Sequence, residues 1–127
     1  MPILNIKALP QNDSSKVRTA LKKTCLAIAE FYQCQPSQVW ATWEELKPGM
    51  YMEGDLSVDS QPQGTHPPIA QLTCFEGLTT DRIEKILELT ASTLSSHLGL
   101  ENNIFITYHE AKSGQVIAGD GIVRKQK

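Results

Sequence analysis

Two stretches of this 127-residue sequence decide how it folds: VWATWEELKPGMYMEGD, residues 39–55, and IFITYHEAKSGQVIAGD, residues 104–120. They align without a gap, and the second begins 65 residues after the first. Each opens on apolar and aromatic residues and continues into a glycine-flanked turn, as a strand followed by a hairpin does. The chain therefore contains an internal repeat. Six aligned pairs are identical: Thr42/Thr107, Glu45/Glu110, Lys47/Lys112, Gly49/Gly114, Gly54/Gly119 and Asp55/Asp120.

A helix pattern precedes each copy of the repeat. Asp13 or Ser14 can cap the first helix. Thr79 or Thr80 can cap the second, and Gly99 is a natural end for it. Apolar residues and one threonine recur at steps of three and four in each half, which places them on one helix face: Val17, Ala20, Leu21, Thr24, Ile28 and Phe31, then Ile83, Ile86, Leu87, Thr90, Leu94 and Leu98.

A short apolar strand precedes each helix, at residues 2–8 and 68–75, and both strands begin with Pro-Ile. Each half is thus predicted to be strand–helix–strand, and a helical crossover makes its two strands parallel. The predicted fold class is α+β, with two β-α-β units forming a mixed sheet of four or more strands and two helices on one face. We expect one domain over residues 1–127, with repeats at 2–55 and 68–121 and a Ser-, Gln-, Pro- and Gly-rich linker at 56–67.

The second strand of each half, residues 39–43 and 104–108, carries apolar or aromatic side chains in both alternating sets. A strand of this kind is buried on both faces. Two helices cover only one face of a sheet. We therefore expect further copies of the chain to cover the other face in a closed cyclic oligomer.

The composition narrows the class of protein. Hydrophobic residues make up 40% and charged residues 20% of the chain, and the net charge is −2. This balance favours neither nucleic acid nor an anionic membrane surface as a partner. No apolar run reaches the roughly 20 residues of a membrane helix, and the N-terminus lacks a signal-peptide pattern. The odd cysteine count predicts free thiols in a reducing, cytoplasmic setting, and the histidines show no metal-ligand spacing, so we expect no metal site.

The duplicated arrangement of Met-Pro-apolar start, β-α-β unit and glycine-rich hairpin resembles the tautomerase superfamily. Its members include 4-oxalocrotonate tautomerase (4-OT), malonate semialdehyde decarboxylase, the 3-chloroacrylic acid dehalogenases and macrophage migration inhibitory factor. The segment PIAQLTCFEG, residues 68–77, resembles the first strand of 4-OT most closely. The resemblance covers nearly the whole chain. It implies the tautomerase fold, a homotrimer and an isomerase that needs no cofactor.

By this resemblance Pro2 is the catalytic residue. Once Met1 is removed, Pro2 is a secondary amine, and an apolar pocket lowers the pKa of such an amine by disfavouring its charged form. A fraction that is neutral near pH 7 can act as a general base. If Met1 stays attached, Pro2 is an inert amide. The equivalent Pro68 has its nitrogen in a peptide bond, so we expect one working site per chain.

The arginines that clamp the substrate of 4-OT have no counterpart here. Their positions correspond to Asn12 and Trp40 in the first half, and to Leu78 and Phe105 in the second. The arginine pair of the decarboxylase and the dehalogenases falls at residues 75–78, which read Phe-Glu-Gly-Leu. Loss of a bidentate carboxylate partner disfavours those two activities.

An aromatic pocket wall remains as the candidate for substrate binding. Tyr51 corresponds to a pocket phenylalanine of 4-OT, and Phe105 and Thr107 correspond to a pocket tyrosine and asparagine of the inhibitory factor. With Trp40 and Asn12, these residues favour a keto–enol tautomerase acting on an enol or 2-oxo acid. The alternatives are that Trp40 and Phe105 form interface core, that Tyr51 is an exposed hairpin residue, and that the chain is a non-catalytic trimeric binding protein.

Overall fold

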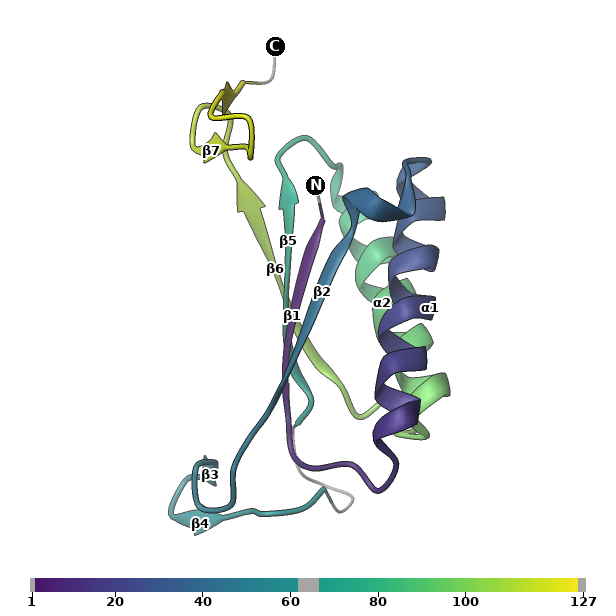
Figure 1. Cartoon of the computed structure of the whole chain (residues 1–127), viewed down its shortest axis with the longest axis vertical. Helices are drawn as coiled ribbons and strands as arrows, with labels where there is room; N and C mark the ends of the chain where they lie inside the picture. The colour runs from purple at the N-terminus through teal and green to yellow at the C-terminus, as the bar shows by residue number, and fades with distance from the viewer. Residues whose placement is uncertain (1, 62–66, 126–127) are drawn as a thin grey trace.

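The computed structural model describes residues 2–61 and 67–125 and shows two β-α-β units that share one sheet (Figure 1). The first unit consists of β1 (Ile3–Ala8), α1 (Ser14–Tyr32), the short 3₁₀ helix η1 (Pro36–Gln38) and β2 (Trp40–Glu45). The second consists of β5 (Ile69–Phe75), α2 (Thr80–Leu98) and β6 (Phe105–Ala111). A hairpin follows each unit: β3 (Met52–Glu53) with β4 (Leu56–Ser57), and β7 (Val116–Ile117) with β8 (Val123–Arg124).

The helices begin and end at the residues that local chemistry favours. The Asp13 carboxylate accepts a hydrogen bond from the Ser15 amide at 3.0 Å and caps α1. Thr79 caps α2 by accepting from the Arg82 amide at 3.3 Å. Gly99 ends α2 in the left-handed conformation, at φ +69°. Gln33 ends α1 in the same conformation, at φ +53°.

The four long strands lie in the order β2-β1-β5-β6, with parallel pairs at both edges and the antiparallel pair β1–β5 in the centre. The mixed sheet and its helices confirm the predicted fold class. In the central pair, Ile3 lies opposite Thr73 and Lys7 lies opposite Ile69. The two strands therefore start at opposite ends of the sheet. Pro2 and Pro68, which precede them, lie at these opposite ends.

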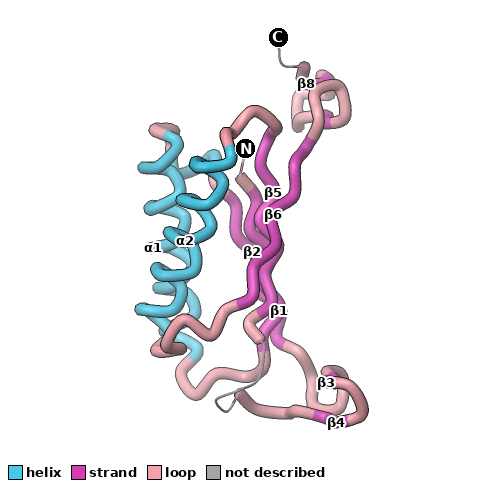
Figure 2. Tube along the Cα trace, turned by 180° about the vertical axis from the view of Figure 1, so that it is seen from behind, coloured by secondary structure: helices cyan, strands magenta, loops and turns pink. Residues whose placement is uncertain are grey.

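Both helices pack on the same face of the sheet, and the other face is open (Figure 2). The core lies between sheet and helices. The open face carries Trp40 and Phe105, which are 55% and 53% exposed. Core residues alternate along β1 and β5 and recur every four residues along the two helices. They are Leu4, Ile6, Ala70, Leu72 and Cys74 on the strands, and Ala20, Thr24, Ile28, Ile86, Thr90 and Leu94 on the helices.

The two hairpins extend beyond opposite ends of the sheet (Figure 1). Gly54, at φ +67°, forms part of the two-residue turn between β3 and β4. The second turn is longer, and there Gly121 takes the positive φ of +79°. The repeat thus loses its residue-by-residue correspondence at Gly54/Gly119. β4 occupies the first two residues of the expected linker, of which residues 62–66 lie outside the described part of the chain.

Neither helix in the described ranges is long and apolar enough to cross a membrane.

Candidate functional site

Pro2 lies directly before β1, on the side of the sheet that the helices cover. Its side chain is buried, and its carbonyl accepts a hydrogen bond from the Trp40 amide at 3.1 Å. That contact continues the parallel pairing of β1 with β2 by one residue. Pro2 is therefore held in position by backbone pairing within the sheet. Met1, whose removal the sequence prediction requires, lies outside the described residues.

A group of polar side chains lies beside Pro2 beneath the helices. Since Ile3 pairs with Thr73, Pro2 and Cys74 are the next residues along the two antiparallel strands, and both are buried. The Cys74 thiol interacts with the hydroxyls of Tyr32, at the end of α1, and Tyr108, on β6. We refer to Tyr32, Cys74 and Tyr108 as the thiol–hydroxyl cluster.

Burial sets the protonation state of this cluster. Desolvation raises the pKa of the Cys74 thiol and of the Tyr32 hydroxyl above their ordinary values, and it raises the pKa of Tyr108 to about 12. All three groups are thus neutral at pH 7. Neither tyrosine hydroxyl makes a hydrogen bond of standard geometry within the described residues, although both oxygen atoms are buried. A buried hydroxyl without a partner is uncommon in proteins and calls for an explanation.

An arginine lies at the same end of the helix layer. The Arg82 guanidinium stacks on the Phe31 ring, 3.9 Å from its centroid, and donates a hydrogen bond to the Phe31 carbonyl at 3.2 Å. This geometry links the start of α2 to the end of α1. Arg82 thereby brings a positive charge to the end of the sheet where Pro2 lies.

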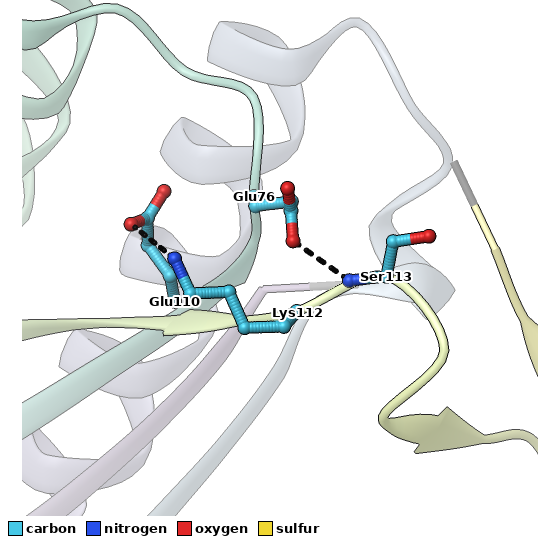
Figure 3. Close-up of polar contacts among 4 residues, drawn as sticks. All are labelled: Glu76, Glu110, Lys112 and Ser113. Atoms are coloured by element: carbon cyan, nitrogen blue, oxygen red, sulfur yellow. Dashed lines mark hydrogen bonds and ion pairs between the residues drawn. The ribbon is translucent and has the colours of Figure 1, made fainter. Parts of the chain in front are cut away.

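Glu76, which follows β5 at this end, has a structural partner (Figure 3). Its carboxylate accepts a hydrogen bond of 2.7 Å from the Ser113 amide, at the start of the β7–β8 hairpin. Lys112 forms an ion pair of 3.3 Å with Glu110 on the opposite side of the strand end. In the sequence, Glu76 is a carboxylate that directly follows the apolar stretch at residues 68–75. In the structure it holds the hairpin to β5.

The predicted substrate-binding residues are divided between the two ends of the sheet. Trp40 lies at the Pro2 end. Phe105 pairs with Ile69, which in turn pairs with Lys7, five residues and roughly 16 Å along the sheet from Pro2. There Phe105 lines a pocket of about 340 Å³ with Tyr51, Met52 and Ile69.

The two remaining predicted residues also lie away from Pro2 within one protomer. Asn12 follows the far end of β1 and lines a pocket of about 430 Å³ that Lys16 and Leu98 also line. Thr107 lies on β6, and its hydroxyl is 2.8 Å from the Nε2 atom of His109. Tyr51 donates a hydrogen bond of 2.7 Å to Glu53. A single protomer thus brings only Trp40, of the five, to the end where Pro2 lies.

The sequence patterns did not single out Cys74, which the strand pairing sets beside Pro2, or Tyr32 and Tyr108, which interact with Cys74. A signal was present in the repeat itself. Tyr32 aligns with an apolar leucine in the second half, and Cys74 aligns with an alanine in the first. Tyr32 belongs to the first half and Cys74 to the second, so these differences mark one end of the sheet and not one copy of the repeat.

The sequence matches no family model and no curated protein. Solved structures match it closely in three dimensions. Native fused 4-OT has a TM-score of 0.81 at 15% identity, over 95% of this chain and 94% of that one. A fused 4-OT asymmetric trimer has a TM-score of 0.82 at 11% identity over the same shares.

Malonate semialdehyde decarboxylase is similar at a TM-score of 0.69 and 13% identity, over 94% of this chain and 92% of that one. At such identities the likeness concerns the path of the backbone and not the side chains of a site. The resemblance read from the sequence is confirmed at this level: the chain has the tautomerase-superfamily fold, in the fused two-unit form that the 4-OT structures share.

Proposed function

We propose that this protein is a cofactor-independent keto–enol tautomerase in which Pro2, after removal of Met1, is the general base. The observation that carries the proposal is the position of Pro2. It heads β1, is buried, and is held by the Trp40 amide at one end of a tautomerase fold. The equivalent Pro68 has its nitrogen in the bond to Pro67 and cannot accept a proton.

The chemistry follows from the properties of a buried secondary amine. Burial disfavours the ammonium form and lowers the pKa of the amine, so that neutral nitrogen is present near pH 7. The nitrogen lone pair takes a proton from an enol hydroxyl or from a carbon next to a carbonyl. The resulting ammonium returns a proton to the conjugated carbon, which restores the neutral amine and completes the isomerisation.

The substrate class is an enol or a 2-oxo acid with an apolar or aromatic body. The Trp40 amide donates to the Pro2 carbonyl, and the Trp40 indole supplies an aromatic surface on the open face at the same end of the sheet. None of the four positions at which 4-OT places its clamping arginines carries an arginine here. A dicarboxylate would therefore bind without its bidentate partners, which favours substrates of lower charge.

A homotrimer completes the site in this proposal. The open face exposes Trp40 and Phe105, and the hairpins expose Met52 and Ile117, at 54% and 67%. Two fused 4-OT structures of the same fold are trimers. Further copies that cover the open face would bring the Tyr51–Phe105 pocket of one protomer toward Pro2 of the next.

The test is ketonisation of phenylenolpyruvate by protein whose intact mass shows that Met1 is absent. We expect turnover by the wild type, slower turnover of 2-hydroxymuconate, and a loss of about 10²–10⁴-fold in Pro2→Ala. Pro68→Ala is the matched control and should retain activity. Equal rates for wild type and Pro2→Ala, or Met1 still attached to natively expressed protein, would contradict the proposal.

An electrophilic probe tests the base without a natural substrate. Pt0534, a structure of this fold with a TM-score of 0.77, is inactivated by 2-oxo-3-pentynoate. Incubation of this protein with the same compound should add one probe mass to each chain, on the peptide that begins at Pro2. Labelling elsewhere, or none, would count against a free and reactive Pro2 amine.

A non-catalytic trimeric binding protein is the second candidate. The missing arginine clamp favours it, because a carboxylate substrate has no predicted partner. Under this alternative the wild type binds aromatic 2-oxo acids, detected by calorimetry, but ketonises none of them above the rate in buffer.

A further inference from the structure

The two ends of the sheet are equivalent in fold but differ in chemistry. The repeat aligns Tyr32 with Leu98 and Cys74 with Ala8 at an offset of 66 residues, and Tyr108 with Trp43 at an offset of 65. Each member of the thiol–hydroxyl cluster thus has an apolar counterpart at the Pro68 end. These three polar groups come from elements that meet toward the end of the sheet where the proline can become a free amine.

The hydroxyls of this cluster lack the partners that buried hydroxyls ordinarily have. Both tyrosine oxygen atoms are buried; among residues 2–61 and 67–125 each interacts with the Cys74 thiol but makes no hydrogen bond of standard geometry. Replacing either tyrosine by phenylalanine, which keeps the ring, would remove an unsatisfied group. The hydroxyls therefore cost stability here, which points to a ligand or a group that pairs with them.

We propose that the thiol–hydroxyl cluster is a positioning device for Pro2: a tyrosine hydroxyl accepts a hydrogen bond from the Pro2 N–H once Met1 has been removed. A neutral proline amine has one N–H and one lone pair. When the cluster accepts from the N–H, the lone pair is directed toward the substrate. After Pro2 takes a proton, the ammonium has two N–H groups, one held by the cluster and one available for return to carbon. No covalent bond to the cluster forms or breaks during these steps.

The geometry that supports this assignment is the proximity of strand and helix ends. Pro2 and Cys74 are neighbours across the central strand pair, and the Cys74 thiol interacts with both tyrosine hydroxyls. The loop that leaves Tyr32 ends at Trp40, whose amide is bonded to the Pro2 carbonyl. A charged side chain acts on each of the two tyrosines. Arg82 of α2 acts on Tyr32, and Glu110 of β6 acts on Tyr108.

The inference rests on the proposed role of Pro2, but it has a readout of its own. The double variant Tyr32→Phe/Tyr108→Phe keeps the ring shapes and removes both acceptors. Hydrogen bonds to a charged donor are stronger than those to a neutral one, so the cluster favours the protonated amine. The pKa of the Pro2 amine, followed by nitrogen NMR of proline-labelled protein lacking Met1, should fall by about one unit in the double variant.

Activity gives a second readout, which a purely structural role would not produce. In the double variant the acidic limb of the profile of kcat/KM against pH should move to lower pH. At the same time kcat should fall several-fold with little change in KM, because the Pro2 lone pair is no longer oriented toward the substrate. The single variants assign the effect to Tyr32 or Tyr108, and they remain informative if the double variant fails to fold.

The matched control is Thr24→Val, which removes another buried hydroxyl without a partner in the described residues, about 12 Å along α1 from Tyr32. It should leave the Pro2 pKa unchanged. If the double variant folds and the pKa of its Pro2 amine is unchanged or raised, the proposal is overturned. If the wild type has no turnover, the proposed tautomerase fails, while the NMR titration still decides whether the cluster binds the Pro2 amine.

Discussion

The same residue type, proline, begins β1 and β5, and its chemical capacity depends on what precedes it. Pro68 continues from Pro67 and is an amide in every state of the chain. Pro2 becomes an amine when Met1 is removed. The backbone contacts of the two prolines are equivalent. The Trp40 amide donates to the Pro2 carbonyl at 3.1 Å, and the Phe105 amide donates to the Pro68 carbonyl at 3.0 Å. A single covalent difference therefore separates a proposed base from a structural residue.

The helix ends offer a second comparison between equivalent residues. Gln33 and Gly99 end α1 and α2 in the left-handed conformation, which costs a non-glycine residue about 1–2 kcal/mol. We expect Gln33→Gly to raise the free energy of unfolding by about 0.5–1 kcal/mol and Gly99→Ala to lower it by about 1 kcal/mol. Urea denaturation measures both. A loss of stability in Gln33→Gly would show that its side chain makes a compensating interaction.

Ionisation of the buried tyrosines predicts a loss of stability in alkali. The pKa of Tyr108 is raised from 10 to about 12 by burial. A group whose folded pKa is raised contributes stability that is complete below its unfolded pKa and is lost as pH rises through the folded value. The free energy of unfolding of wild type should therefore fall relative to that of Tyr108→Phe between pH 10 and 12. Parallel curves for the two proteins over that range would contradict the burial of the hydroxyl.

At the scale of elements, the β7–β8 hairpin depends on a contact with β5. The Glu76 carboxylate accepts from the Ser113 amide at 2.7 Å, where the chain leaves β6 for the hairpin. Glu76→Ala should destabilise the protein by about 1–2 kcal/mol and speed hydrogen exchange of the Ser113 amide. Glu76→Gln keeps an acceptor oxygen and should retain most of the protection. Unchanged exchange in Glu76→Ala would show that the hairpin is held by other contacts.

The helix pair is joined at the Pro2 end by Arg82. Its guanidinium lies over the Phe31 ring and also donates to the Phe31 carbonyl. An exposed cation–π contact is worth about 0.5–1 kcal/mol, so Arg82→Ala should lower the free energy of unfolding by about 1 kcal/mol. Arg82→Lys should recover only part of it, because an ammonium lacks the planar stacking surface. Thermal denaturation at two salt concentrations measures both variants.

At the scale of the whole molecule, the open sheet face and the two hairpins would form the contacts between copies in the proposed trimer. Most of the large exposed apolar side chains in the described residues lie on these parts, among them Trp40, Phe105, Met52 and Ile117. Ile117→Asp places a charge in the proposed interface and should convert the trimer to smaller species, measured by light scattering after gel filtration. Leu26→Asp, at a 38% exposed position on α1, is the control and should leave the trimer intact. Loss of the trimer in the control as well would mean that the mutations act on folding.

The sequence by itself determined the architecture. The period of three to four residues in α1 and α2, their caps at Asp13 and Thr79 and the duplicated strand stretches are local patterns, and each predicted the element that the structure contains. The repeat also predicted two β-α-β units in one sheet, with the apolar strand face of each unit buried against the helices. Local propensity and hydrophobic periodicity agree here, and such agreement makes a fold predictable.

Only the tertiary structure decided which residues surround Pro2. The antiparallel pairing of β1 with β5 sets Cys74 beside it and places Phe105 at the far end of the sheet, although Trp40 and Phe105 are equivalent in the repeat. No local pattern encodes the order and direction of strands from different halves. The register of long-range pairs results from the packing of the whole core. The site therefore takes its base from the sequence and its neighbours from the fold.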